Sequence, residues 1–118
     1  MKILVVDDES NIVDILRFNL QREGYEVLAA YDGKEGLEKA QTQSPDLILL
    51  DVMLPEMDGF AVCRPIREKD NPPIIILSAR DTREDKLNWL NLGADDFISK
   101  PFDGSVLIQL LKGLRLPE

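Results

Sequence analysis

Five short apolar runs recur along the chain, each followed by charged or turn-forming residues, and this alternation constrains the fold more than any other feature. The runs are KILVV at 2–6, YEVLAA at 25–30, DLILLD at 46–51, PIIILS at 73–78 and DDFIS at 95–99. The third and fourth runs are apolar throughout their middle, which is typical of strands covered on both faces. Because amphipathic stretches separate the runs, the sequence predicts an α/β domain with a parallel sheet and helices on both faces.

The stretch after the first run has the start and stop signals of a helix. Ser10 is the predicted cap of a helix that runs to about Glu23, and Gly24 is its predicted stop. The apolar residues near helical spacing are Ile12, Ile15, Leu16 and Leu20.

Four further helices are expected, one after each remaining run. Asp32 begins the second helix, which carries Leu37 and Ala40 and stops before Pro45. The third is expected from about Asp58 to Glu68. The last two are expected at 83–92, between a Thr82 cap and Gly93, and at 104–114.

Length and composition limit the number of domains and the kinds of partner and chemistry. A chain of 118 residues with 44% apolar residues fits one domain with a single core, and we assign residues 1–118 to it. The net charge of −8 argues against contact with nucleic acid, because phosphate binding needs a basic face. The sequence has no histidine, which excludes imidazole catalysis and histidine-ligated metal sites.

The compartment is inferred from cysteine usage and hydropathy. Cys63 is the only cysteine in the sequence, so no internal disulfide can form and a reduced cytoplasmic setting is expected. The N-terminal MKILVV lacks the pattern of a signal peptide, and no apolar run approaches the roughly 20 residues of a membrane helix.

Charged residues follow three of the apolar runs, where a parallel sheet would bring them to one edge. Asp7 and Asp8 follow the first run, Asp51 ends the third and Lys100 follows the fifth. Ligands of such sheets bind beyond the carboxyl ends of the strands. Clustered carboxylates repel one another, and a hard cation such as Mg²⁺ would remove that repulsion. The alternative for Asp7 and Asp8 is that they only favour the dipole of the following helix.

Asp51 has the setting of a nucleophile toward phosphorus. It ends an apolar strand before a loop containing Pro55 and Gly59, and a carboxylate there can form an acyl phosphate with help from Mg²⁺. Ser78, at the end of the fourth run, and Lys100, before Pro101, could contact a phosphoryl oxygen. The structural alternatives are a solvated loop aspartate for Asp51 and an ordinary strand-end hydroxyl for Ser78.

In combination, five segments closely resemble the receiver domain of two-component response regulators. They are VVDDE, PDLILLDVMLPEMDGF, LSA, GADDF and KPF, and the resemblance covers the whole chain. MLPEMDG, the SAR–DK–GADDF spacing and KPF resemble the OmpR/PhoB-like subfamily. The resemblance implies a flavodoxin-like (βα)5 fold with five parallel strands in the order 2-1-3-4-5.

The same resemblance implies a role for each matching residue. Asp51 would be the phosphoacceptor and would take its phosphoryl group from a sensor histidine kinase. Ser78 and Lys100 would contact that group, and Phe97 would be the ring that turns inward when Ser78 moves. Such a domain catalyses only its own phosphorylation and dephosphorylation. The implied ligands of Mg²⁺ are Asp7, Asp8, Asp51 and the backbone carbonyl of Met53.

In the subfamily, the fourth helix, fifth strand and fifth helix form a symmetric dimer face held by salt bridges. Lys86 and Asp96 match two of the charged positions, but Val106 and Leu110 stand where an acidic residue and an arginine are expected. We therefore expect a hydrophobic partner face, used for a homodimer or an engineered partner.

Trp89 stands where a small residue is usual, and it extends this apolar face. It lies about 200° around the helix from Leu87, which is predicted to be a core residue, so Trp89 is expected to be exposed. With Leu92, Val106 and Leu110 it would form one apolar surface, of the kind that marks interfaces. The alternative is a rotated helix that places these residues in the core.

Two further features bear on what the chain is. Pro65 falls inside the expected third helix, and with the altered fifth helix it is consistent with a designed or chimeric sequence. The chain stops at Glu118, so no effector domain is expected.

Two other functions would use some of the same residues. A constitutive binding module would use the apolar face without phosphorylation. A haloacid-dehalogenase-like phosphatase is disfavoured, because Met53 occupies the place of its second aspartate.

Overall fold

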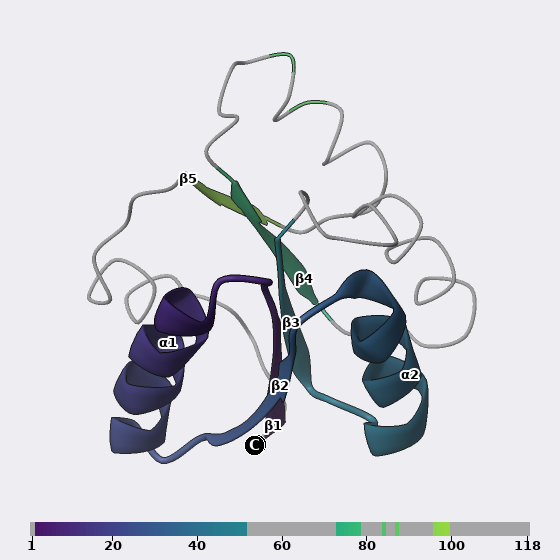
Figure 1. Ribbon diagram of the computed structural model, residues 1–118. Helices are drawn as coiled ribbons and strands as arrows, with labels where there is room; N and C mark the ends of the chain where they lie inside the picture. The colour runs from purple at the N-terminus through teal and green to yellow at the C-terminus, as the bar shows by residue number, and fades with distance from the viewer. Residues whose placement is uncertain (1, 52–72, 79–83, 85–86, 88–95, 100–118) are drawn as a thin grey trace.

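The sheet has the predicted order and direction. The computed structural model describes residues 2–51, 73–78, 84, 87 and 96–99 (Figure 1). All four neighbouring pairs of strands are parallel, and the order is β2-β1-β3-β4-β5. This is the flavodoxin-like arrangement expected from the sequence. The strands are β1 (Lys2–Val6), β2 (Glu26–Ala30), β3 (Leu47–Asp51), β4 (Ile74–Ser78) and β5 (Asp96–Ser99).

Two helices cover opposite faces of this sheet. Figure 1 shows α1 (Ser10–Arg22) on one side of the strands and α2 (Gly33–Gln43) on the other. Of the expected helix at 83–92, Glu84 and Leu87 are described, and both are helical. The expected helices at 58–68, which contains Pro65, and at 104–114 lie outside the described residues.

Alternation along the strands divides the core into two clusters, because successive side chains of a strand point to opposite faces. On the α1 face, Ile3 and Val5 of β1 pack with the inner residues of that helix. On the α2 face, Leu4 and Val6 pack with Ala40. Leu47, Ile48, Leu49 and Leu50 of β3 are all fully buried, which explains why this run is uniformly apolar.

The inner stripe and the start of α1 differ from the sequence prediction. Val13, Leu16 and Leu20 are buried, whereas Ile15 is 51% exposed, so Ile15 was wrongly placed among the inner residues. The N-cap is Glu9, and Ser10 is the first helical residue. The helix starts one residue earlier because the carbonyl of Glu9 already accepts hydrogen bonds from the backbone N–H groups of Ile12 and Val13. At the other end Gly24 has a positive φ of 91°, which confirms the predicted stop.

The start of α2 is held by a reciprocal pair of hydrogen bonds. The carboxylate of Asp32, the N-cap, accepts from the backbone N–H of Glu35 at 2.7 Å. The carboxylate of Glu35 accepts in turn from the backbone N–H of Tyr31 at 2.8 Å. This arrangement satisfies two backbone donors at the helix start. It makes Asp32, the predicted start, the N-cap of α2, and Gly33 is the first helical residue.

Leu87 is a second correction to the sequence analysis. Its side chain is 51% exposed, so it is not the core residue from which the orientation of Trp89 was argued. The predicted orientation of Trp89 was inferred from its position around the helix relative to Leu87 alone. No second buried residue fixed the rotation of the helix. The exposure of Trp89 therefore loses its sequence-based support.

Gly36 of α2 lies close to the end of β1. A Cβ at this position would lie 2.8 Å and 2.9 Å from the two Cγ atoms of Val6. Val6 is β-branched and fully buried, so its side chain has little freedom to move away.

We therefore predict that Gly36→Val lowers the free energy of unfolding by about 2 kcal/mol, the usual cost of overpacking a core. The control is Glu38→Val on the exposed side of the same helix, which should change stability by less than about 0.5 kcal/mol. Urea denaturation of both variants measures the difference. Equal stability of the two would show that α2 can move away from Val6 at little cost.

Candidate functional site

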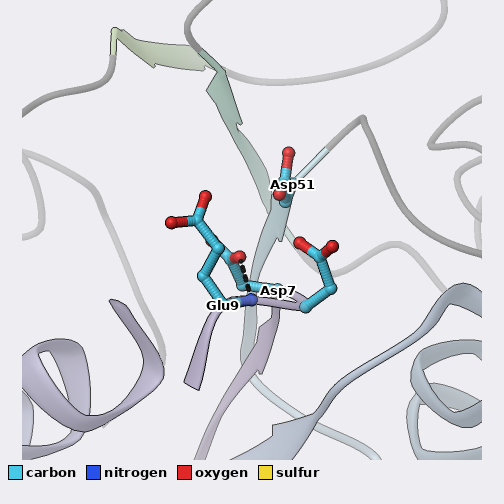
Figure 2. Close-up of side chains that lie close together, drawn as sticks. Asp7, Glu9 and Asp51 are labelled. Carbon is cyan, nitrogen blue, oxygen red and sulfur yellow. Dashed lines mark hydrogen bonds between the residues drawn. The ribbon is translucent and has the colours of Figure 1, made fainter. Parts of the chain in front are cut away.

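The ends of β1 and β3 bring acidic side chains together, as the sequence predicts. The last paired residues of these strands are Val6 and Leu50, so one further step along the register places Asp7 beside Asp51. Figure 2 shows the side chains of Asp7, Glu9 and Asp51 close together at this edge. One carboxylate oxygen from each of Asp7, Asp8, Glu9 and Asp51 lies within 4.8 Å of the others.

Two of these carboxylates are buried and two are exposed. Asp7 is 0% exposed and Asp51 is 4% exposed, and they are the buried charged side chains of the described part of the chain. Asp8 and Glu9 are exposed to solvent. At 4.8 Å, two such charges repel by about 3 kcal/mol with an effective dielectric constant near 20. The exposed pair repels less because solvent screens it.

Backbone hydrogen bonds fix the position of Asp7. Its N–H donates to the carbonyl of Ala30 at 3.1 Å, which continues the pairing of β1 with β2. Its carboxylate accepts from the backbone N–H of Glu9 at 2.9 Å, drawn as the dashed line in Figure 2. This second bond closes a turn at the end of β1. The turn explains how the adjacent residues Asp7 and Asp8 reach one site, although neighbours on a strand face opposite ways.

Sequence reasoning missed Glu9. It is the third acidic residue in the VVDDE segment, and a continued strand would place it on the same face as Asp7 but two residues farther along the chain. The turn through Glu9 redirects it, because the turn makes Glu9 the N-cap of α1. The run of three acidic residues directly before a helix was the available signal.

Three other predicted residues lie in β4 and β5. Ser78 ends β4, and the pairing of Asp51 with Leu77 places it one register step beyond Asp51, at the same edge of the sheet. Phe97 lies in β5, is partly buried and packs against the α2-face cluster. Asp96 begins β5. The structure therefore places these three residues on the strands where the sequence analysis put them.

The remaining predicted residues lie outside the described part of the chain. They are Lys100 and Met53, assigned to the phosphorylation site, and Lys86, Trp89, Leu92, Val106 and Leu110, assigned to the partner face.

The donor set of the site is made of oxygen atoms alone among the described residues. Carboxylate oxygens are the ligands of hard cations, and Mg²⁺ is bound through one or two of them while it keeps several waters. The buried pair, Asp7 and Asp51, with Asp8 at the rim, fits this chemistry. No helix in the described part of the chain is long and apolar enough to span a membrane.

Comparison with known proteins agrees with this geometry. The family model for the response regulator receiver domain matches residues 3–112. A Francisella response regulator receiver domain is 37% identical with a TM-score of 0.89, covering 94% of this chain and 93% of that chain. Chemotaxis response regulator CheY4 of Vibrio cholerae is 36% identical with a TM-score of 0.90, covering 95% and 96%.

A third similar structure is a two-component response regulator from Clostridium difficile. It is 30% identical with a TM-score of 0.92, and the match covers 96% of this chain and 93% of that chain. The family model and these structures match nearly the whole chain, and the TM-scores show that the structures share its fold. The chain belongs to the response regulator receiver domain family, the signal-receiving domain of two-component systems.

Proposed function

We propose that the domain is a phosphorylation-controlled switch in which Asp51 accepts the phosphoryl group. The observation that carries this proposal is the carboxylate of Asp51, 4% exposed, at the carboxyl end of β3 and within 4.8 Å of three other carboxylates. Burying a carboxylate costs free energy, and membership of the receiver family supports a chemical role for Asp51 as the reason for its burial.

The proposed reaction transfers a phosphoryl group from a histidine nitrogen to a carboxylate oxygen. A carboxylate oxygen of Asp51 attacks the phosphorus of a phosphohistidine on a sensor histidine kinase. A new oxygen–phosphorus bond forms, the nitrogen–phosphorus bond breaks, and the histidine nitrogen leaves with the electron pair. Water attack on the same phosphorus later releases inorganic phosphate. Ser78 and Lys100 are the proposed contacts of the phosphoryl oxygens.

Mg²⁺ is the proposed cofactor, and its chemistry would be to offset the negative charge of the phosphoryl group. The residues that would hold it are Asp7, Asp8, Asp51 and the backbone carbonyl of Met53. Asp7 is suited to this because one hydrogen bond from Glu9 and one to Ala30 already fix its position. The ion would also remove the repulsion between the buried carboxylates.

The proposed output is a change on the face formed by the fourth helix, β5 and the fifth helix. Phe97, partly buried in β5, is the proposed switch ring. Membership of the OmpR/PhoB-like subfamily, proposed from MLPEMDG and KPF, makes a homodimer the first candidate for the partner. A constitutive binding module is the second candidate, supported by the apolar Val106 and Leu110 in place of charges.

Phosphorylation can be tested directly with a small donor. Incubation with acetyl phosphate and Mg²⁺ should add one phosphoryl group, detected by intact-mass spectrometry. Asp51→Asn should abolish the addition because the amide is not a nucleophile toward phosphorus. Asp14→Asn, an exposed aspartate of α1, is the matched control and should be phosphorylated like the parent. An unmodified parent protein would contradict the proposal.

Metal-free stability tests the cost of the carboxylate cluster. Without divalent metal, Asp51→Asn should raise the free energy of unfolding by about 1–3 kcal/mol, because it removes one repelling charge. Mg²⁺ should raise the melting temperature of the parent by binding the folded state, and should raise that of Asp51→Asn much less. Asp14→Asn should behave like the parent in both measurements. A Mg²⁺ response that survives in Asp51→Asn would place the ion elsewhere.

Self-association separates the two candidate outputs. For a phosphorylation-driven homodimer, beryllofluoride with Mg²⁺ should increase the dimer fraction in sedimentation experiments. A constitutive module should give the same distribution with and without beryllofluoride. A protein that stays monomeric at high concentration in both conditions would rule out a homodimer through this face.

A further inference from the structure

The carboxylate of Glu9 belongs spatially to the acidic site, although it is not among the proposed ligands of the ion. One of its oxygens lies within 4.8 Å of oxygens from Asp7, Asp8 and Asp51. Unlike Asp7 and Asp51, it is exposed to solvent. Glu9 therefore stands at the rim of the site, between the buried carboxylates and water.

Glu9 is held there by its backbone. Its N–H donates to the carboxylate of Asp7 at 2.9 Å. Its carbonyl accepts from the N–H groups of Ile12 at 3.0 Å and Val13 at 3.1 Å, in the first turn of α1. With both backbone groups engaged, only side-chain rotation can change the distance between its carboxylate and the site.

We propose that Glu9 tunes the site through its charge, without being a direct ligand of the ion. This inference rests on the proposed function. Glu9 strengthens the binding of Mg²⁺ from the rim, and it slows the entry of anionic phosphoryl donors. A magnesium ion keeps several of its waters, and an exposed carboxylate at the rim is suited to accept hydrogen bonds from them.

The two effects have opposite signs because the cation and the donor carry opposite charges. The four described carboxylates carry a charge of −4, and one divalent ion brings +2, so these groups together leave −2 before the donor arrives. The ammonium of Lys100, the proposed phosphoryl contact, adds the same +1 with and without Glu9 and is left out of this sum. Without the charge of Glu9 the remainder is −1. The cation is then attracted less, and a phosphorylated donor is repelled less.

The test compares Glu9→Gln with Glu23→Gln. The first substitution removes the charge but keeps the length of the side chain. The second removes the same charge from the exposed C-terminal cap of α1, at the end of the helix away from the site. The dissociation constant for Mg²⁺ is measured by calorimetry at low and at high salt. Phosphorylation by acetyl phosphate is then timed at saturating Mg²⁺.

We expect Glu9→Gln to weaken Mg²⁺ binding about three- to tenfold at low salt, and the difference from the parent to shrink at high salt as screening increases. At saturating Mg²⁺, its phosphorylation should be about two- to threefold faster than that of the parent, from the loss of one repelling charge. Glu23→Gln should match the parent in both. Glu9→Asp, which restores the charge, should recover most of the affinity.

Three results would overturn the inference. Unchanged affinity in Glu9→Gln would show that the charge at the rim does not reach the ion. A much larger loss that persists at high salt would make Glu9 a direct ligand. Slower phosphorylation at saturating Mg²⁺ would show that Glu9 assists the transfer.

The same experiment separates this inference from the function on which it rests. If the parent bound no Mg²⁺ and accepted no phosphoryl group, the proposed function would fall and the role of Glu9 with it. If the parent does both and Glu9→Gln is indistinguishable from it, only the role of Glu9 is lost. Circular dichroism of the metal-free variants verifies that α1 is intact.

Discussion

Two negative charges are buried side by side at the ends of β1 and β3, and the packing of the sheet is what holds them there. Asp7 and Asp51 would repel each other and would be better solvated in the unfolded chain. They remain buried because Asp7 directly follows β1 and Asp51 is the last residue of β3. The side chains of both strands pack in the two core clusters of the sheet. Because β1 and β3 are paired in parallel and in this register, the two carboxylates must lie next to each other.

That constraint links the fold to the proposed function. A site built from repelling carboxylates is stabilised by any ligand that neutralises it, so the proposed divalent cation would offset the repulsion between them. A tight helix–strand contact lies next to this point. Gly36 allows α2 to seat on Val6, the residue before Asp7. At the end of β1, Val6 therefore packs against α2 and the next residue, Asp7, belongs to the acidic site.

The sequence predicted the strands and the buried part of the site, because short apolar runs bounded by charged or turn-forming residues and alternating with amphipathic stretches are typical of buried parallel strands. Each observed strand begins within one residue of its apolar run, and the order of the sheet followed from the family resemblance. Asp46 shows why the start can shift by one. Its N–H donates to the Lys2 carbonyl and its carboxylate accepts from the Lys2 N–H, so it joins β1 at the base of the sheet without belonging to β3.

Features that depend on rotation or on a turn were harder to predict. Ile15 and Val13 are both apolar, and spacing alone did not decide which one faces the core. Leu87 shows the same difficulty, because it alone was used to infer which face of its helix points to the core, and it is exposed. Glu9 joined the site through a turn that ends β1, and strand alternation does not predict where a side chain lies after such a turn.

The central claim is that Asp51 is the residue that carries the phosphoryl group. Borohydride reduces an acyl phosphate of aspartate to homoserine, so peptide mapping after phosphorylation and reduction identifies the acceptor. The account predicts homoserine at position 51 and at no other aspartate. Homoserine at Asp7 or Asp8, or unreduced aspartate at all positions of a phosphorylated sample, would contradict it.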